Sequence, residues 1–114
     1  MIKNSTITLN VKDLDKSISF YESLGMNTKQ RWGDNYAELS APGILIGLHP
    51  ASEKNLVGNS GNASIGFTTD NFEEVKTLLN SLFIKTTYRD EEGGSFLHFN
   101  DPDGSSLYFI KPKY

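Results

Sequence analysis

Apolar and polar residues alternate near the start of the chain, and the spacing then changes to three and four. In residues 6–11 (TITLNV) every second residue is apolar, which predicts a strand with one covered face. From Asp13 onward the apolar positions follow a helical spacing, with Asp13 as a suitable N-cap. Gly25 favours the left-handed backbone that ends a helix. The pattern therefore predicts a strand followed directly by a helix that ends at Gly25.

The same pattern occurs a second time, 58 residues later, between positions 64 and 82 of the 114 residues. Here Asp70 is the predicted N-cap, and Glu73 stands three residues on, the spacing of a capping box. Residues 73–82 carry the apolar stripe of the second helix. Two copies of one unit of about half the chain length predict a repeated module.

Each predicted helix is followed by three short segments that favour strands, separated by turn sequences. The predicted strands are 26–32, 36–40, 44–49, 84–88, 95–99 and 106–111, with turns at 33–35, 41–43, 90–94 and 101–104. We therefore predict an α+β fold of two βαβββ modules, which form a curved eight-stranded mixed sheet, or half-barrel, around a cavity. The prediction is a single domain over 1–114, with module 1 at about 1–50, a linker at 51–62 and module 2 at about 63–114.

Composition and charge exclude several classes of protein. The chain has no cysteine, so disulfides and thiolate metal sites are excluded. Its net charge is −3 with dispersed lysines, and it lacks the basic stripe of a nucleic-acid-binding protein. No segment approaches the roughly 18 apolar residues of a membrane-spanning helix, and the first residues do not resemble a signal peptide. We therefore expect a cytoplasmic protein with no nucleic-acid or membrane partner.

Two motifs resemble those of a known superfamily. Residues 9–25 read L-x-V-x-D-L-x-x-S-x-x-F-Y-x-x-L-G, and residues 99–104 read F-x-D-P-D-G. Together they resemble the vicinal oxygen chelate superfamily of glyoxalase I, extradiol dioxygenases, fosfomycin resistance enzymes and bleomycin resistance proteins. The resemblance covers essentially the whole chain and implies the half-barrel fold.

The resemblance also implies where a metal would be bound. In metal-dependent members histidine or glutamate ligands stand at four positions, which correspond here to Thr6, Gly47, Ser64 and Tyr108. A divalent ion needs imidazole or carboxylate ligands, which this set does not offer. We therefore expect no metal, no cofactor and no catalytic residue. Members of the superfamily that lack the metal are best known as binders of small molecules.

Residues on the sheet face opposite the helices are the candidates for ligand binding. Hydroxyl groups can form hydrogen bonds with a ligand, aromatic rings can form a wall for a planar one, and Glu38 can pair with a cation. Each candidate also has an ordinary explanation as a strand-forming, core or surface residue. The candidate ligand-binding residues are Thr6, Thr8, Trp32, Tyr36, Glu38, Gly47, His49, Ser64, His98 and Tyr108.

Three functions are consistent with these residues. The leading hypothesis is a metal-independent small-molecule binding protein, working as a homodimer, that sequesters an antibiotic or another aromatic or cationic compound. The first alternative is a metal-dependent lyase or dioxygenase-like enzyme whose metal site has moved to His49, His98 and Glu38. The second is a structural or regulatory domain without a ligand, whose cavity is filled by Trp32, Tyr108 and Phe96.

Overall fold

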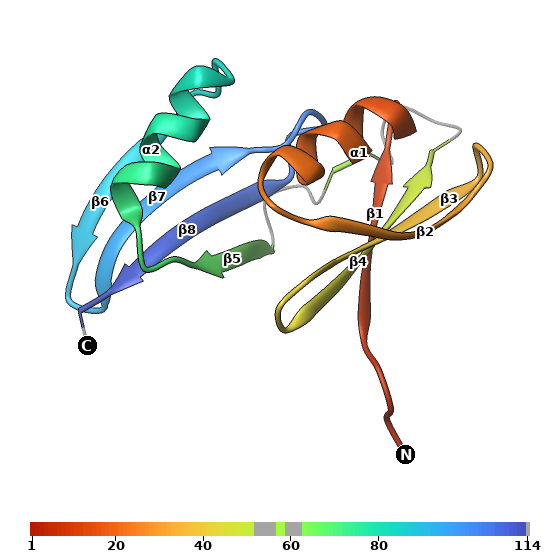
Figure 1. The fold of residues 1–114 in the computed structure, drawn as a ribbon, viewed down its shortest axis with the longest axis horizontal. Coiled ribbons are helices and arrows are strands. Elements are labelled where there is room, and N and C mark those ends of the chain that lie inside the picture. The colour runs from red at the N-terminus through yellow and green to blue at the C-terminus, as the bar shows by residue number, and fades with distance from the viewer. Residues whose placement is uncertain (52–56, 59–62, 114) are drawn as a thin grey trace. The chain divides into compact units, whose positions relative to one another are not determined.

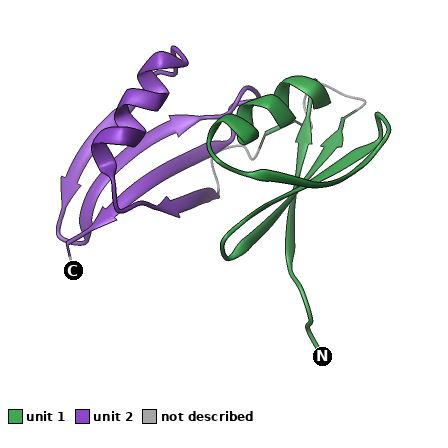
Figure 2. Ribbon diagram, in the orientation of Figure 1, with its two compact units in different colours: residues 1–58 green, residues 59–114 purple. Residues whose placement is uncertain are grey.

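The computed structural model contains two compact units, residues 1–58 and residues 59–114 (Figures 1 and 2). It describes residues 1–51, 57–58 and 63–113, so most of the predicted linker lies outside the described residues. Each unit holds one βαβββ module, which confirms the predicted α+β class. No helix among the described residues is long and apolar enough to span a membrane. The elements are β1 (Thr6–Val11), α1 (Leu14–Ser23), β2 (Asn27–Trp32), β3 (Tyr36–Ala41), β4 (Ile44–Pro50), β5 (Ser64–Thr68), α2 (Phe72–Ser81), β6 (Thr87–Glu91), β7 (Gly94–Asn100) and β8 (Ser106–Pro112).

The eight strands form two mixed sheets of four strands each, one in each unit. The strand orders are β1-β4-β3-β2 and β5-β8-β7-β6. In each sheet the first strand of the module pairs in parallel with the last, and the other pairs are antiparallel. The core of each unit lies between its helix and one face of its sheet. Large apolar side chains that are almost completely buried include Val11, Tyr21, Leu39, Ile46 and Leu48 in the first unit, and Leu79, Leu97 and Leu107 in the second.

The N-terminal caps of the two helices differ in how well the sequence predicted them. At α1 the carboxylate of Asp13 accepts a hydrogen bond from the backbone N–H of Lys16 at 3.1 Å, as predicted. At α2 the predicted cap Asp70 is wrong, because Asn71 takes that place. The Asn71 side chain accepts from the N–H of Glu74 at 3.0 Å and donates to the Glu74 carboxylate at 3.1 Å. The capping pair therefore lies one residue later than predicted.

Both helices end in the same hydrogen-bonded motif, and the strand that follows each begins later in the sequence than predicted. In α1 the N–H of Met26 donates to Tyr21, and in α2 the N–H of Ile84 donates to Leu79. These bonds, each from an N–H five residues after its acceptor, are those of a Schellman cap. The predicted strand starts at residues 26 and 84 were therefore wrong by one and three residues. At the other end of β6, Asp90 and Glu91 belong to the strand rather than to the predicted turn.

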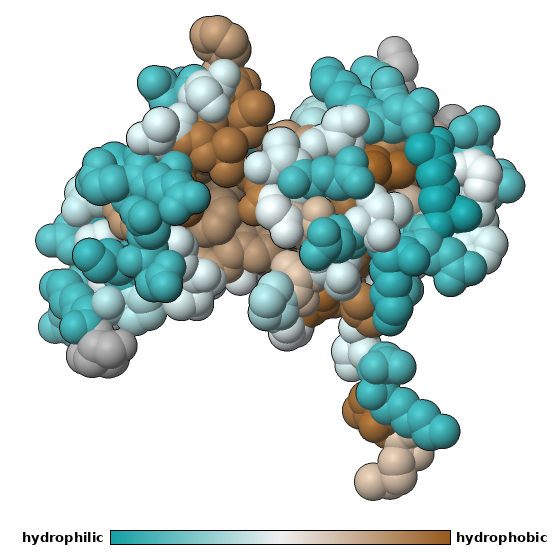
Figure 3. All heavy atoms as spheres, viewed as in Figure 1, coloured by the Kyte–Doolittle hydropathy of each residue, from teal (hydrophilic) through white to brown (hydrophobic). Residues whose placement is uncertain are grey.

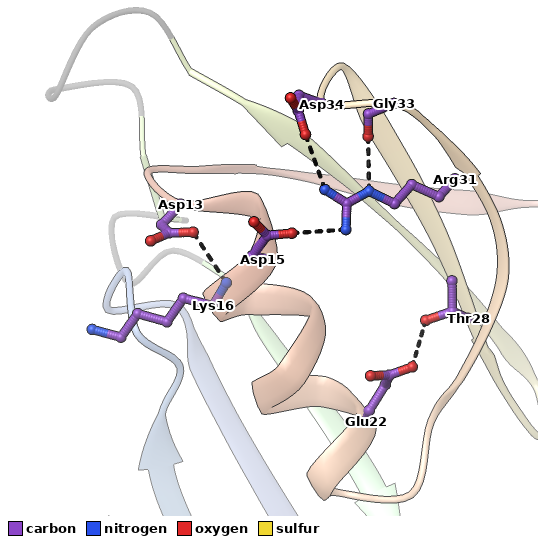
Figure 4. Close-up of polar contacts among 8 residues, drawn as sticks. All are labelled: Asp13, Asp15, Lys16, Glu22, Thr28, Arg31, Gly33 and Asp34. Atoms are coloured by element: carbon purple, nitrogen blue, oxygen red, sulfur yellow. Dashed lines mark hydrogen bonds and ion pairs between the residues drawn. The ribbon is translucent and has the colours of Figure 1, made fainter.

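An arginine joins the strand side of the first unit to its helix (Figure 4). Arg31 on β2 forms ion pairs with Asp15 of α1 at 2.8 Å and with Asp34 of the following turn at 3.2 Å. Its Nε atom also donates to the backbone oxygen of Gly33 at 2.7 Å. The hydrogen bond and the negative charge of Asp15, followed by those of Asp34, raise the pKa of Arg31. The guanidinium thus holds the β2–β3 turn and α1 together.

Candidate functional site

The sheet face opposite α1 carries most of the predicted site residues of the first unit. Strand register aligns Thr8 of β1, Gly47 of β4 and Glu38 of β3 in one row across the sheet. This row faces away from the core, because Leu9 of β1 and the residues on both sides of Glu38 and Gly47 are buried. Two flanking rows carry Thr6 with Leu45, and Asn10 with His49. On β1 the predicted alternation holds for the buried Leu9 and Val11, whereas Ile7, from which the same burial was expected, is 47% exposed.

Tyr36 lies directly over Gly47 on this face. A Cβ atom placed at Gly47 would overlap the hydroxyl of Tyr36 and would lie 3.0 Å from Oγ1 of Thr8. The ring of Trp32 is 5.4 Å from that of Tyr36, in a tilted pair, and 45% of Trp32 is exposed. Glycine at position 47 thus lets an aromatic ring lie against the backbone of β4.

The second unit has a similar arrangement, but the glycine lies on its first strand, β5, and the tyrosine on its last strand, β8. Gly66 of β5 pairs with Tyr108 of β8, and a Cβ atom at Gly66 would overlap the Tyr108 ring. Tyr108 in turn pairs with His98 of β7, which pairs with Thr87 of β6. In both sheets a tyrosine ring therefore covers a glycine on the face opposite the helix, which we call the open face.

Three aromatic rings form a cluster beside Gly66. Phe96 and His98 are stacked, with ring centroids 5.9 Å apart and planes 11° apart. Tyr108 is tilted against both, with centroids 5.8 Å from Phe96 and 5.6 Å from His98. All three are half-buried, so one side of the cluster remains open.

An open groove runs along this cluster over β6 and β7. Its volume is about 510 Å³, and it is lined by Thr87, Arg89, Glu91, Phe96 and His98. The sequence did not predict the contribution of β6, because that strand was placed three residues too early and ended at residue 88. Arg89 and Glu91 would have been found by continuing the alternation from Thr87 along the true strand.

A second hollow lies on the opposite side of the same sheet, at the start of α2. It has a volume of about 330 Å³ and is lined by Asp70, Asn71, Phe72, Glu73, Lys76, Tyr88, Ser95 and Lys111. Its charges are mixed, and Lys76 is already paired with Glu73 at 3.6 Å. The Lys76 ammonium also lies 5.6 Å from the centre of the Tyr88 ring. These contacts explain the residues of this hollow as packing of α2 on its sheet.

The four positions at which the resemblance places metal ligands do not fit a divalent ion. Gly47 has no donor atom, and Tyr108 packs on Gly66. The hydroxyl of Ser64 is hydrogen-bonded to that of Ser106 at 2.8 Å. Neutral hydroxyl groups are poor substitutes for imidazole and carboxylate ligands. Across the described residues no group of three or more histidine, aspartate or glutamate side chains is placed to hold a metal ion.

Residues 4–109 match the sequence model of the family described as "Glyoxalase/Bleomycin resistance protein/Dioxygenase superfamily". The match spans both modules. The chain belongs to this superfamily. A curated relative from Mycolicibacterium smegmatis, described as an uncharacterized protein, is 37% identical over 57 residues, which cover 46% of this chain and 49% of that protein. The chain thus matches about half the length of that relative.

Solved structures share the fold of this superfamily member over nearly the whole chain. The antibiotic-binding protein TnmS3 from Streptomyces sp. CB03234 has a TM-score of 0.77 at 16% identity, with 99% of this chain and 98% of that chain covered. The bleomycin resistance determinant encoded on transposon Tn5 has a TM-score of 0.72 at 22% identity, with coverage of 99% and 100%. Lactoylglutathione lyase from Agrobacterium tumefaciens has a TM-score of 0.72 at 20% identity, with coverage of 97% and 92%. At these identities the similarity demonstrates the fold, which binding proteins and an enzyme share.

Proposed function

We propose that this superfamily member is a metal-independent small-molecule binding protein that sequesters a planar aromatic compound, such as an antibiotic. The observation that carries the proposal is the use of the open sheet faces. Tyr36 and Tyr108 each lie on a glycine there, and their rings offer flat apolar surface with a polar tip. Small-molecule sites are typically built from such aromatic surface with a few polar groups.

The chemistry of the four expected ligand positions supports independence from metal. In metal-dependent catalysis the ion acts as a Lewis acid on substrate oxygens. Thr6, Gly47, Ser64 and Tyr108 offer no carboxylate or imidazole for such an ion. A carboxylate at position 47 would also collide with the ring of Tyr36. The residues at these positions are better suited to contacts with an organic ligand.

The open groove argues for a ligand rather than for a purely structural domain. In a structural domain the aromatic side chains would fill the space beside them. Here Phe96 and His98 are half-buried and line a groove of about 510 Å³. This volume falls within the range of roughly 300–1,000 Å³ found for small-molecule sites.

We further infer that the protein is a cytoplasmic homodimer. In each sheet the first and last strands in the order have one unpaired edge within that sheet, and pairing between subunits is a common way to cover such edges. The absence of cysteine is consistent with a reducing compartment. Sedimentation equilibrium should give a mass twice the 12.7 kDa of one chain, and a mass of 12.7 kDa would refute the dimer.

Thermal unfolding of chelator-treated protein tests the proposed function. A specific ligand at a hundredfold excess over its Kd should stabilise the fold by about 2.7 kcal/mol. We expect members of a panel of planar aromatic compounds to raise the unfolding temperature, and nickel, zinc, manganese and ferrous ions to leave it unchanged. Stabilisation by one ion that is lost in a His49→Ala or His98→Ala variant would refute metal independence.

Variants of the aromatic residues locate the binding. Phe96→Ala should abolish the stabilisation by aromatic compounds, because it removes a stacked ring from the groove. Phe83→Ala is the matched control, because it removes the same ring from a position that is 96% exposed and lies at the end of α2. Equal loss in both variants would contradict binding at the open face.

A further inference from the structure

The groove over β6 and β7 is lined by aromatic rings from one strand and by polar and charged side chains from the other. The rings are those of Phe96 and His98, which are nearly parallel and two residues apart on one face of β7. The polar and charged side chains come from β6, where Arg89 pairs directly with Phe96 and Thr87 pairs with His98. Side chains directly opposite each other on antiparallel strands have Cβ atoms about 5 Å apart. The Arg89 side chain therefore leaves the sheet next to the side chain of Phe96.

Arg89 has its charge available for a ligand. No ion pair or side-chain hydrogen bond joins Arg89 to another described residue. Arg89 is exposed, as are its neighbours on β6. An arginine that is not engaged with a protein carboxylate keeps its five N–H donors for an external acceptor.

We propose that this groove binds planar aromatic compounds that carry a carboxylate or a similar anionic group, with Arg89 as the residue that recognises the anion. The inference rests on the proposed function and names the ligand class of that site. The ring system would pack against the rings of Phe96 and His98, in the offset or edge-to-face contacts that aromatic rings prefer. The carboxylate would accept two parallel hydrogen bonds from the guanidinium, whose planar fork matches its geometry.

The position of the acidic residue in the groove favours an anionic over a cationic ligand. Glu91 is the last residue of β6 and pairs with Gly94, next to the turn. It therefore lies two residues beyond Arg89, away from the stacked rings. A ligand bound against Phe96 and His98 lies next to Arg89, whereas Glu91 lies beyond the rings, opposite Gly94. This order of charges along β6 sets the preferred sign of the ligand.

Isothermal titration calorimetry with three matched probes tests the inference. The probes are 2-naphthoate, the neutral 2-naphthamide and the cationic 2-naphthylmethylamine, which share one ring system. Hydrogen bonds to charged groups are the stronger ones, so we expect 2-naphthoate to bind about tenfold more tightly than 2-naphthamide. The amine should bind no more tightly than the amide, and added salt should reduce the preference for the anion.

Three variants assign the preference to Arg89. Arg89→Gln should remove the difference between 2-naphthoate and 2-naphthamide, and Glu91→Gln should increase it a few-fold. Lys111→Gln is the matched control, because it removes one positive charge from the opposite face of the same sheet, where Lys111 pairs with Ser95. It should leave the difference unchanged.

The outcomes separate this inference from the proposed function. Equal binding of the acid and the amide, or a preference that survives Arg89→Gln, overturns the role of Arg89. If Phe96→Ala still abolishes binding in that case, the proposed function stands. If none of the three probes binds in a way that depends on Phe96, both proposals are overturned.

Discussion

The ends of the two helices offer an internal comparison of the same backbone motif with two different residues. Gly25 follows α1 with a φ angle of 106°, and Phe83 follows α2 with a φ angle of 58°. Each donates its N–H to the residue three positions earlier, at 3.0 Å in both cases. The left-handed conformation costs an L-residue about 1–2 kcal/mol, whereas glycine adopts it freely. The second module therefore carries strain that the first avoids.

The magnitude of a Phe83→Gly change follows from three terms. The relief of strain is about 1–2 kcal/mol, and the greater freedom of glycine in the unfolded chain offsets about 0.5–1 kcal/mol of it. The ring itself contributes little, because Phe83 is 96% exposed. We expect Phe83→Gly to raise the free energy of unfolding by about 0.5–1 kcal/mol. The mirror change, Gly25→Ala, should lower it by about 1 kcal/mol.

Urea unfolding followed by far-UV circular dichroism measures these differences, with Phe83→Ala as the control. Alanine removes the ring but keeps the strained backbone, so its stability should equal that of the native chain. A Phe83→Gly variant no more stable than Phe83→Ala would refute the strain argument. A loss of more than about 1 kcal/mol in Phe83→Ala would instead mean that the ring is packed in solution. Figure 3 shows apolar surface along α2 and at its end, where Leu82 is also 38% exposed.

Three further predictions address Gly47 in the candidate site, the ion pairs of Arg31 and the N-terminal cap of α2. Gly47→Ala should displace the Tyr36 ring from its place over β4. The loss of binding free energy for aromatic ligands, measured by calorimetry, should exceed the loss in free energy of unfolding, measured in urea. Unchanged binding would contradict this. Arg31→Gln should lower the unfolding temperature in dilute buffer, and the difference should shrink in 1 M NaCl, because salt screens exposed pairs. Asn71→Ala should cost about 1 kcal/mol in urea unfolding, and Asp70→Ala less; the reverse order would restore Asp70 as the cap.

The sequence predicted the order of elements because short-range patterns determine it. Alternation in 6–11 and the apolar stripe after Asp13 placed β1 and α1, and the turn sequences at 33–35 and 41–43 separated the three strands that follow. Boundaries were less predictable where two local signals compete. Residues 84–86 favour a strand by composition, yet the cap at the end of α2 engages Ile84 and delays β6. At α2 two adjacent residues, Asp70 and Asn71, could both serve as caps, and only the backbone distinguishes them.

The candidate site was predictable in part for the same reason. Alternation identified residues that share the face opposite the helix in several strands, including Tyr108 and His98, but not in β6. It could not show that tyrosine rings lie on Gly47 and Gly66, because that depends on strand register between segments far apart in sequence. Arg89 was missed because the strand that carries it was shifted. Pairing with Phe96 is a property of the sheet and leaves no trace in the local sequence.

The two modules differ most where their open faces are built. In the first sheet the row across the strands runs Thr8, Gly47, Glu38, and the covering tyrosine comes from β3. In the second sheet Gly66 occupies the place of Thr8, and Tyr108 occupies the place of Gly47. A glycine and a tyrosine are thus retained on both faces, although they stand on different strands. Any substitution that introduces a side chain at either glycine must displace a tyrosine ring. A metal-binding carboxylate side chain at position 47 is therefore incompatible with the observed position of Tyr36. This coupling supports the proposal that the face binds an organic ligand rather than a metal ion.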